Sequence, residues 1–353
     1  MANYTNLKSL FVDIADAIRE KTGETGKIIA DDFPDKIDTI RGGSKFPNGT
    51  EWTRSIITSD IICLHNADGI WVAGTQVFGL YYSTDGKKWT TSNITSGRFN
   101  CIHNANGIWV VGSDNNGLYY STDGKNWTQS NVTSGHFYCL HNANGIWVAG
   151  SIDQHGLYYS TDGMNWTESN ITSGYIFCLH NANGIWAAGT EYAGLYYSTD
   201  GMNWTQSNIT SGSFRCLHNA NGIWVAGSYN NGLYYSTDGI NWTQSNFTSG
   251  RFNYLHNANG IWAAVGGEGL YYSTDGMNWT WSNIDSNGFS CLHNANGVWV
   301  AVGHGLYYST DGMNWTQSNV ISGSFGCLHY ANGVWVAGSM SNGLYYSIGW
   351  QPS

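Results

Sequence analysis

The sequence predicts an all-β fold, an eight-bladed β-propeller of four-stranded antiparallel blades in which an N-terminal strand closes the last blade, preceded by a small helical module. Three observations predict the propeller. A segment of 36 to 39 residues occurs eight times, and a period in this range indicates a repeat architecture. Each copy contains four short stretches rich in Val, Ile, Tyr, Trp and Thr, with no helix-length run between its glycines. The first and last copies are incomplete in complementary ways, as ring closure requires.

The copy at 113–150 shows how one blade is built. Phe-Tyr-Cys-Leu-His reads as a first strand, Ile-Trp-Val-Ala-Gly as a second, Gly-Leu-Tyr-Tyr-Ser as a third and Asn-Trp-Thr-Gln-Ser as a fourth. Asn-Ala-Asn-Gly and Ser-Thr-Asp-Gly are expected to be turns, because Asn and Gly adopt positive φ at low cost. Four strands in about 40 residues are typical of a propeller blade. A β-solenoid, the alternative, would need shorter rungs and parallel stacking.

The chain ends predict how the ring closes. A Trp-Thr strand at 51–55 comes before any first, second or third strand, and the last copy stops after its third strand at 344–347. We therefore expect the N-terminal strand to become the outer strand of the eighth blade, which leaves no unpaired sheet edge at the junction. The predicted domains are a helical attachment or oligomerisation module at 1–43 and the propeller at 44–353.

Composition excludes some classes of partner. Residues 1–43 carry 6 Lys/Arg and 8 Asp/Glu, which leaves 8 and 16, a formal charge of −8, for residues 44–353. No basic stripe is present, so nucleic-acid binding is not expected. No run of 18 apolar residues exists, so we expect no membrane span. Sixteen of the 18 Trp occupy two repeat positions and are expected to pack between blades, whereas Trp281 and Trp350 break the pattern.

Cysteines and Asn-x-Thr triplets also recur with the repeat. Seven cysteines stand two residues before the repeat histidine, and Tyr254 takes this place in the sixth copy. We expect free buried thiols, because equivalent positions in adjacent blades need not come within bridging distance, and synthesis in a reducing cytoplasm fits this. The N-terminus shows no apolar signal core, so we interpret triplets such as 93–95 as turn chemistry and not as glycosylation sites.

The first 43 residues predict a separate helical module. Apolar residues from Leu7 to Ile18 recur at helical spacing, a second short helix is expected after Asp32, and 42–44 forms a linker. About 40 residues bury little core alone. The apolar stripe is therefore expected to meet a second copy of itself, the propeller or a larger assembly.

Residues 10–23 (LFVDIADAIREKTG) and 28–34 (IIADDFP) resemble the N-terminal module of tail and fibre proteins in phages and prophages of gut Firmicutes. This resemblance implies a virion protein, made in the bacterial cytoplasm, whose first 43 residues attach a distal domain to tail or baseplate proteins. It does not indicate what the distal domain binds.

The Ser-Thr-Asp-Gly turn raises the possibility of catalysis. Its aspartates are Asp85, Asp123, Asp162, Asp200, Asp238, Asp275 and Asp311. The motif resembles a shortened Asp-box (BNR repeat) of sialidase-like and other bacterial propellers. All seven copies of the motif carry the same Asp, so we interpret it as a turn in which the carboxylate accepts backbone N–H bonds. Sialidases need an arginine cluster and an acid–base pair, and we find no such set among the four propeller arginines and the acidic residues. An enzyme is therefore not expected.

One histidine per copy suggests a metal site. The histidines are His65, His103, His141, His180, His218, His256, His293 and His329. Identical positions in eight blades would place them around a wide ring and not at one tetrahedral site. We expect buried, hydrogen-bonding histidines, and neither a metal nor another cofactor.

The copies differ from one another mainly in two links, from the fourth strand to the first and from the second to the third. Strand direction alternates, so both links should emerge at one end of every blade, opposite the constant turns. Aromatic, amide and guanidinium side chains in such loops suit ligand contacts, although neutral drift of exposed loops is the alternative. The candidate ligand-binding residues are Arg98, Asn100, His136, Tyr138, Tyr175, Arg215, Arg251, Asn253, Asp114, Asn115, Asp153, Gln154, His155, Glu191, Tyr192, Tyr229, Asn230, Glu268 and His304.

Together these features lead us to expect a phage tail-associated receptor-binding or adhesion protein that recognises a bacterial surface glycan, or a protein receptor, through the variable face. Several copies per virion, or a homo-oligomer, would raise avidity. Two alternatives stay open: a structural tail or fibre component that binds another virion protein, and a glycan-cleaving propeller enzyme.

Overall fold

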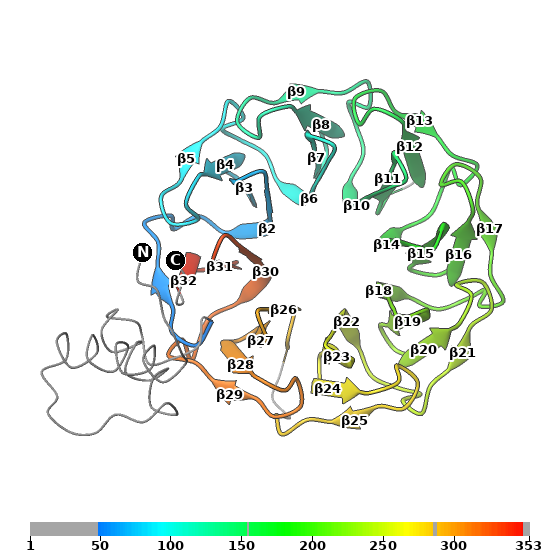
Figure 1. Cartoon of the computed structure of the whole chain (residues 1–353). Coiled ribbons are helices and arrows are strands. Elements are labelled where there is room, and N and C mark those ends of the chain that lie inside the picture. Colours follow the sequence, from blue (N-terminus) through cyan, green and yellow to red (C-terminus); the bar gives the residue numbers. More distant parts are fainter. Residues whose placement is uncertain (1–48, 154, 285–287, 349–353) are drawn as a thin grey trace, which may run out of the picture. The chain divides into compact units, whose positions relative to one another are not determined.

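The structure, a computed structural model, describes residues 49–153, 155–284 and 288–348, and these form eight four-stranded antiparallel sheets around a closed ring (Figure 1). The innermost strands are β2 (Ile61–Ala67), β6 (Phe99–Ala105), β10 (Phe137–Ala143), β14 (Ile176–Ala182), β18 (Phe214–Ala220), β22 (Phe252–Ala258), β26 (Cys291–Ala295) and β30 (Phe325–Ala331). The second strands are β3 (Ile70–Thr75), β7 (Ile108–Ser113), β11 (Ile146–Ser151), β15 (Ile185–Thr190), β19 (Ile223–Ser228), β23 (Ile261–Gly266), β27 (Val298–Val302) and β31 (Val334–Ser339). The third strands are β4 (Leu80–Ser83), β8 (Leu118–Ser121), β12 (Leu157–Ser160), β16 (Leu195–Ser198), β20 (Leu233–Ser236), β24 (Gly269–Ser273), β28 (Leu306–Ser309) and β32 (Gly343–Ile348). The outer strands are β5 (Thr90–Thr91), β9 (Thr128–Gln129), β13 (Thr167–Glu168), β17 (Thr205–Gln206), β21 (Thr243–Gln244), β25 (Thr280–Trp281), β29 (Thr316–Gln317) and β1 (Thr53–Arg54).

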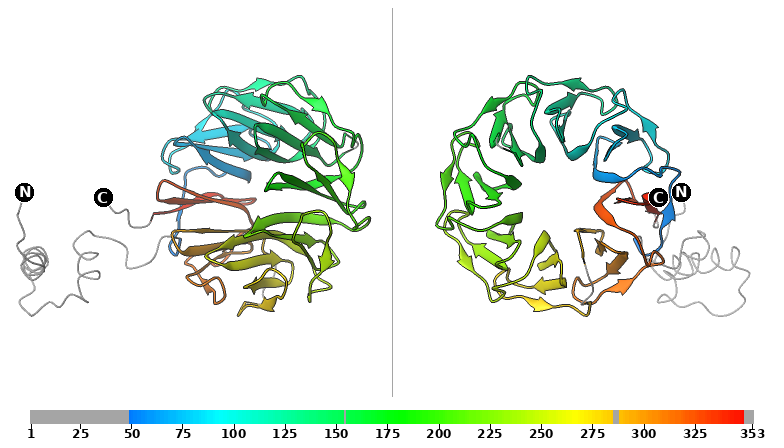
Figure 2. Two further views of the ribbon diagram at one scale, coloured as in Figure 1. Left: turned by 45° about the vertical axis from the view of Figure 1, so that its right-hand side comes forward. Right: turned by 180° about the vertical axis from the view of Figure 1, so that it is seen from behind.

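The eight-bladed propeller and its closing strand are thereby confirmed. β1 pairs antiparallel with β32, Thr53 opposite Tyr346 and Arg54 opposite Tyr345, and completes the sheet β1-β32-β31-β30. Neighbouring innermost strands contact one another around the whole ring, β30 and β2 included, and the ring seen from behind is equally complete (Figure 2). The compact propeller unit runs from Gly49 to Ile348. The helical module expected at 1–43 lies outside the described residues.

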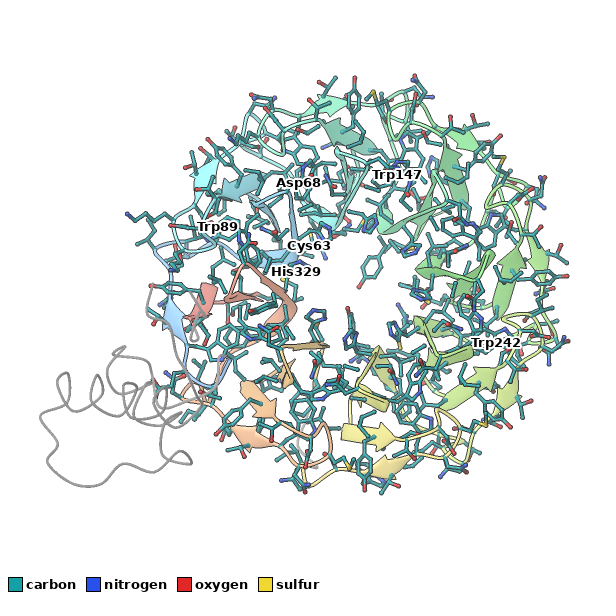
Figure 3. The ribbon with its side chains drawn as sticks, in the orientation of Figure 1. Cys63, Asp68, Trp89, Trp147, Trp242 and His329 are labelled. Carbon is teal, nitrogen blue, oxygen red and sulfur yellow. The ribbon has the colours of Figure 1, made fainter. Side chains whose placement is uncertain are left out.

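The core lies between blades. Trp109 of β7 is 2% exposed and packs with Cys63 and Val72 of the preceding blade. Figure 3 shows Cys63 toward the centre of the ring and Trp89 and Trp242 nearer its outer edge. The expected packing of the repeat tryptophans between blades is confirmed, whereas Trp281 is exposed and lies against Tyr271, with 4.4 Å between ring centroids. Among the described residues, no helix could cross a membrane.

The cysteine position joins adjacent blades near the channel. All seven cysteines are free, as expected, and the thiol of Cys63 donates to the carbonyl oxygen of Phe99 in the next blade at 3.1 Å. Burial raises the pKa of Cys101 to about 12. Glycine stands opposite the thiol in six of the seven blades that carry one, and a Cβ on Gly112 would lie 2.6 Å from the Cys101 Sγ. In the seventh, Val302 pairs with Cys291. In the other six blades the missing side chain of glycine makes room for the thiol.

The Ser-Thr-Asp-Gly turns have the expected structure. The Asp123 Oδ1 accepts from the backbone N–H groups of Lys125 at 2.8 Å and Asn126 at 2.7 Å, and from the Ser121 hydroxyl at 2.9 Å. Partial burial raises the pKa of Asp123, but these hydrogen bonds outweigh it and lower the pKa to about 2. The carboxylate is fully engaged in its own turn.

The Asn-x-Thr asparagines that follow the outer strands correct one expectation, because they bridge blades. Those of the Asn-Trp-Thr triplets serve the local turn as expected, since the Asn126 Nδ2 donates to the Asp123 Oδ2 at 2.8 Å. The Asn93 Nδ2 donates to the Trp127 carbonyl oxygen at 2.9 Å, and the Trp127 N–H donates to the Asn93 Oδ1 at 2.8 Å. We call this paired contact the amide clamp. The clamps join Asn93 to Trp127, Asn131 to Trp166, Asn170 to Trp204, Asn208 to Trp242, Asn246 to Trp279, Asn283 to Trp315 and Asn319 to Trp52.

The junction between the last blade and the first differs. Ile56 stands two residues after Arg54, where the other outer strands are followed by the clamp asparagine, and its side chain is 82% exposed. At this junction the Ser55 hydroxyl donates to the Lys87 carbonyl oxygen at 3.2 Å. The seam of the ring therefore has an apolar side chain in water where the other junctions have an amide clamp.

Replacing Ile56 with Asn should supply the eighth clamp. The two hydrogen bonds of the clamp should each add about 0.5–1.5 kcal/mol to the free energy of unfolding. We therefore expect the variant to unfold at a temperature a few degrees higher, measured by circular dichroism. Ile56→Ala is the matched control, since it removes the exposed side chain without adding an amide. An unfolding temperature for Ile56→Asn no higher than that of Ile56→Ala would contradict the clamp's contribution.

Candidate functional site

The variable links lie together at one end of the blades, as predicted. In the second blade the Asp114 N–H donates to the Arg98 carbonyl oxygen at 3.0 Å, and the Glu191 and Tyr175 backbones are joined in the same way at 3.0 Å in the fourth. The constant turns of adjacent blades contact one another instead. A Cβ on Gly124, in the Asp-Gly turn of the second blade, would lie 3.0 Å from Ile70, which directly follows the Asn-Ala-Asp-Gly turn of the first blade. The propeller therefore has one variable and one constant face.

A β-bulge places one residue of each blade at the centre of the variable face. In seven blades the register shifts between the opening Phe or Ile of the innermost strand and the following Cys or Tyr, as between Phe99 and Cys101. The residue inside the bulge has no ladder partner, which frees its side chain to point away from the sheet. We call these the bulge residues: Ile62, Asn100, Tyr138, Phe177, Arg215, Asn253 and Gly326, with Ser290 at the matching position of the remaining blade.

A cavity of about 560 Å³ lies among these side chains and forms the channel mouth. It is lined by Ile62, Asn100, Tyr138, Arg215, Tyr229, Arg251, Asn253, Tyr254, Ser290, Gly326 and Met340. All the bulge residues except Phe177 are among them. Because the scaffold repeats while these side chains differ, the mouth is an irregular surface on a nearly symmetric ring.

A second cavity of about 480 Å³ shares Arg215, Asn253 and Tyr254 with the mouth and extends inward to leucines and histidines. The Tyr254 side chain is 37% exposed, although other residues lie on all sides of it. This fits an aromatic ring that projects into the channel. The electrostatic effect of Cys291 is the main cause that raises the pKa of Tyr254, and burial is the second. The two cavities form one funnel from the variable face into the ring.

The eight histidines form a closed ring at the inner part of this funnel. Neighbouring imidazole centroids are 4.8 to 6.0 Å apart, and Figure 3 shows His329 at the inner edge of the ring of blades. Each ring also meets the Trp of the next blade edge to face, as His65 meets Trp109 at 5.7 Å. We expected hydrogen bonds to hold the histidines. A hydrogen bond to the Asn66 backbone is found for His329, but aromatic contacts connect all eight.

This geometry does not suit a single metal ion. A ring of eight with this spacing has a radius of about 7 Å, far beyond the Zn–N distance of about 2 Å. Among the described residues, no group of three or more His, Cys, Asp or Glu is placed to hold a metal. Burial lowers the pKa of His103 to about 4 and, helped by His329 and His103, that of His65 to about 2. The ring is neutral at physiological pH.

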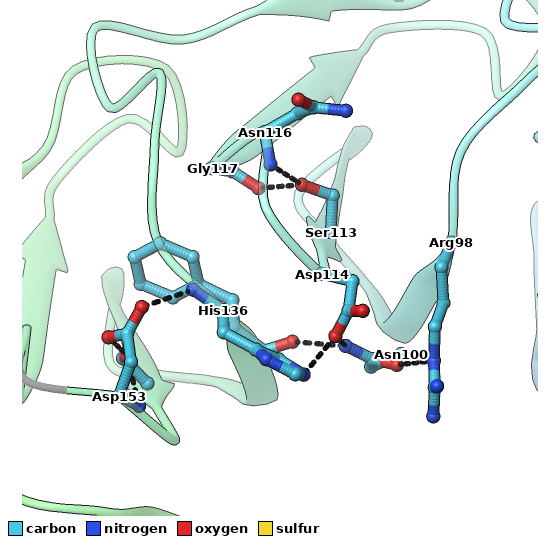
Figure 4. A network of polar contacts seen from close by, with 10 residues as sticks. Arg98, Asn100, Ser113, Asp114, Asn116, Gly117, His136 and Asp153 are labelled. Atoms are coloured by element: carbon cyan, nitrogen blue, oxygen red, sulfur yellow. Dashed lines mark hydrogen bonds and ion pairs between the residues drawn. The ribbon is translucent and has the colours of Figure 1, made fainter.

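Polar contacts fix the rim across the second and third blades (Figure 4). The Arg98 Nε donates to the Asn100 Oδ1 at 3.0 Å, and the Asn100 Nδ2 donates to the Phe137 carbonyl oxygen at 3.2 Å. Asp114 pairs with the His136 Nε2. The bulge residue Asn100 is thereby held between its own blade and the next.

Arginine and tyrosine alternate along the rim of the fifth and sixth blades. The Arg215 Cζ lies 3.4 Å from the Phe177 ring centroid and 5.0 Å from that of Tyr229, and its Nη2 pairs with Glu191 at 3.0 Å. The Arg251 Cζ lies 4.5 Å from the same Tyr229 centroid. Tyr229 is therefore flanked by two guanidinium groups, which attract the face of its ring.

Six predicted residues, Asn100, Tyr138, Arg215, Tyr229, Arg251 and Asn253, line the mouth together. Others lie farther out: Tyr175 contacts Tyr192 at 5.9 Å, His155 pairs with Asp153, and Asn115, Asn230, Glu268 and His304 are exposed. Gln154 lies outside the described residues. We missed Ile62, Tyr254, Ser290, Gly326 and Met340. Ile62, Ser290 and Gly326 share a repeat column with Asn100 and Arg215, so comparing that column across all eight copies would have found them.

Comparisons with known proteins identify the fold alone. No protein-family model and no curated protein matches the chain. The computationally designed protein Ika8 is similar in structure, with a TM-score of 0.70 at 12% identity over 85% of this chain and 100% of that one. YCF48 bound to D1 peptide gives 0.56 at 14% identity over 87% and 96%. BamB from Moraxella catarrhalis gives 0.64 at 9% identity over 86% and 100%.

The histidine ring predicts that stability falls in mild acid. The unfolded chain binds protons below about pH 6.5, whereas burial holds the pKa of five ring histidines at about 4. Stability is therefore complete above pH 6.5 and is lost as the pH falls toward 4, by on the order of 3 kcal/mol for each such imidazole. The turn aspartates take up protons in the unfolded chain only below about pH 4. The histidines therefore dominate the pH dependence of stability above that pH.

We expect the unfolding temperature to drop steeply between pH 7 and pH 5, measured by circular dichroism. His141→Phe keeps an aromatic ring but takes up no proton, and its unfolding temperature should depend less on pH. A wild-type unfolding temperature that is constant from pH 7 to pH 4.5 would refute the proposed role of the ring.

Proposed function

We propose that this protein is a binding module that recognises a bacterial surface glycan through the channel mouth, and that it serves as the receptor-binding part of a phage tail. The observation that carries the proposal is the ring of bulge residues, which differ in type from blade to blade and surround one cavity on the variable face. A rigid scaffold with diversified residues around a concavity is a common arrangement for ligand binding.

The side chains at the mouth suit a sugar. The exposed ring of Tyr138 offers an aromatic face for the C–H surface of a pyranose, and Asn100 and Asn253 bring planar amides to the same cavity. The resemblance of residues 1–43 to tail and fibre modules supports the virion context, with this module attached to tail or baseplate proteins.

Binding without cleavage is the proposed activity. The acidic residues of the variable face that come nearest to the mouth are already engaged: Asp114 with His136, Glu191 with Arg215, and Glu268 with the Tyr271 hydroxyl. Glycoside hydrolysis needs one carboxyl group as acid and a second as base or nucleophile.

The propeller fold also occurs in YCF48 bound to D1 peptide. A protein receptor, or another virion protein, is therefore the second candidate partner. Val77 and Phe78, both more than half exposed on the variable face of the first blade, are the observation that favours it.

The test is binding of the purified full-length protein to host cells and to purified cell-wall polysaccharide. Tyr138→Ala should weaken polysaccharide binding at least tenfold, as expected for loss of a central aromatic contact, with little change in unfolding temperature. Tyr192→Ala is the matched control, because Tyr192 is 71% exposed on the same face but outside the cavity. Equal polysaccharide binding by the two variants would exclude the channel mouth as the binding site. Binding to protease-treated cells separates a glycan from a protein receptor, and released sugars would indicate an enzyme.

A further inference from the structure

The tripeptide Arg-Phe-Asn occurs twice on the variable face, at 98–100 and at 251–253. The Arg Nε donates to the Asn Oδ1 at 3.0 Å in both copies. The Asn Nδ2 then donates to the backbone of the next blade, to the Phe137 oxygen at 3.2 Å and the Phe289 oxygen at 2.9 Å. Each guanidinium is therefore fixed through its Nε to an Asn side chain that is itself anchored and lines the mouth.

The two copies lie on opposite sides of the channel. Arg98-Phe99-Asn100 opens β6 and Arg251-Phe252-Asn253 opens β22, and these strands are four blades apart in a ring of eight (Figure 1). Both asparagines line the same cavity. A ligand that lies across the mouth would thus meet one guanidinium on each side.

These two arginines also keep their charge available. Within the described part of the chain, neither Arg98 nor Arg251 pairs with a carboxylate, whereas Arg215 pairs with Glu191 at 3.0 Å. Their Nη groups make no hydrogen bond to any described residue, since the contacts formed use Nε. An oriented guanidinium with a free edge matches the two oxygens of a carboxylate or phosphate.

The distribution of the other charged residues distinguishes these arginines from the rest of the propeller. Residues 44–353 carry a formal charge of −8, yet three of their four arginines, Arg98, Arg215 and Arg251, lie at or beside the mouth. The lysines Lys87, Lys88 and Lys125 belong to the turns of the constant face. The arginines, whose planar guanidinium groups suit paired oxygens, are thus found mainly beside the proposed ligand site, and the lysines are not.

We propose that the channel mouth binds an anionic glycan, in which one carboxylate or phosphate group contacts Arg98 and another contacts Arg251. This inference rests on the proposed function and narrows its ligand class. A chain with regularly spaced charges satisfies both arginines at once, which a neutral glycan does not.

The experiment compares three polymers by calorimetric titration of the full-length protein: polygalacturonate, its fully methyl-esterified form, and poly(glycerol phosphate). We expect binding to at least one polyanion, none to the neutral ester, and weaker binding as salt rises, because screening acts on exposed charges. Preference between the two polyanions identifies carboxylate or phosphate as the recognised group. No binding to either polyanion, or equal binding of the ester, overturns the proposal.

Variants test the two arginines directly. Arg98→Gln and Arg251→Gln should each weaken polyanion binding about tenfold, and the double variant should show none. Arg54→Gln is the matched control, because it removes the same charge from the outer strand of the last blade, where the Arg54 Nε bonds to the Asn342 carbonyl oxygen. Equal affinities of the double variant and Arg54→Gln would refute the proposal. Binding of the neutral ester that is lost in Tyr138→Ala would refute the anionic ligand while supporting a glycan-binding mouth.

Discussion

Every blade of this protein must bury its sheet against two neighbours, because no blade has a core of its own. Trp109 packs against Cys63 and Val72 of the preceding blade, and the Asn93 amide reaches the Trp127 backbone of the following one. Such interfaces are complete around the circle only because β1 joins β32. The repeated Trp, Gly and Asn positions follow from this constraint, since each serves a contact between two copies of the repeat.

The same constraint separates the two faces. The Asp-Gly turns take part in the interfaces, as Gly124 does against Trp109 and Ile70, so their sequence hardly varies. The backbones of the links at the other end hydrogen-bond within their own blade, as that of Asp114 does with that of Arg98, so the fold leaves their side chains free to differ. The bulge residue combines both properties, because its backbone is fixed by the strand while its side chain points into the channel mouth. Diversity is therefore concentrated where a ligand can reach it.

Most of the fold could be predicted because the repeat is strict and its turns are marked by Asn, Asp and Gly. The spacing predicted eight blades, the incomplete ends predicted the closing strand, and alternating strand direction predicted the two faces. The amide clamps could not be predicted, since the partner of Asn93 lies 34 residues away in another blade. The mouth was predicted only in part: Asn100 and Arg215 stood out as polar contact residues, whereas Ile62, Ser290 and Gly326 did not, although they occupy the same column.

The amino-acid sequence by itself determined the blade, the number of blades and the manner of closure, because these follow from local strand and turn preferences repeated at one period. Only the tertiary structure decided which variable residues share a cavity, that the two Arg-Phe-Asn tripeptides lie across the channel, and that the seam lacks a clamp. The physical reason is that a closed ring brings together side chains that are separated by one or more whole repeats. Their proximity depends on the curvature of the ring, which no single copy of the repeat encodes.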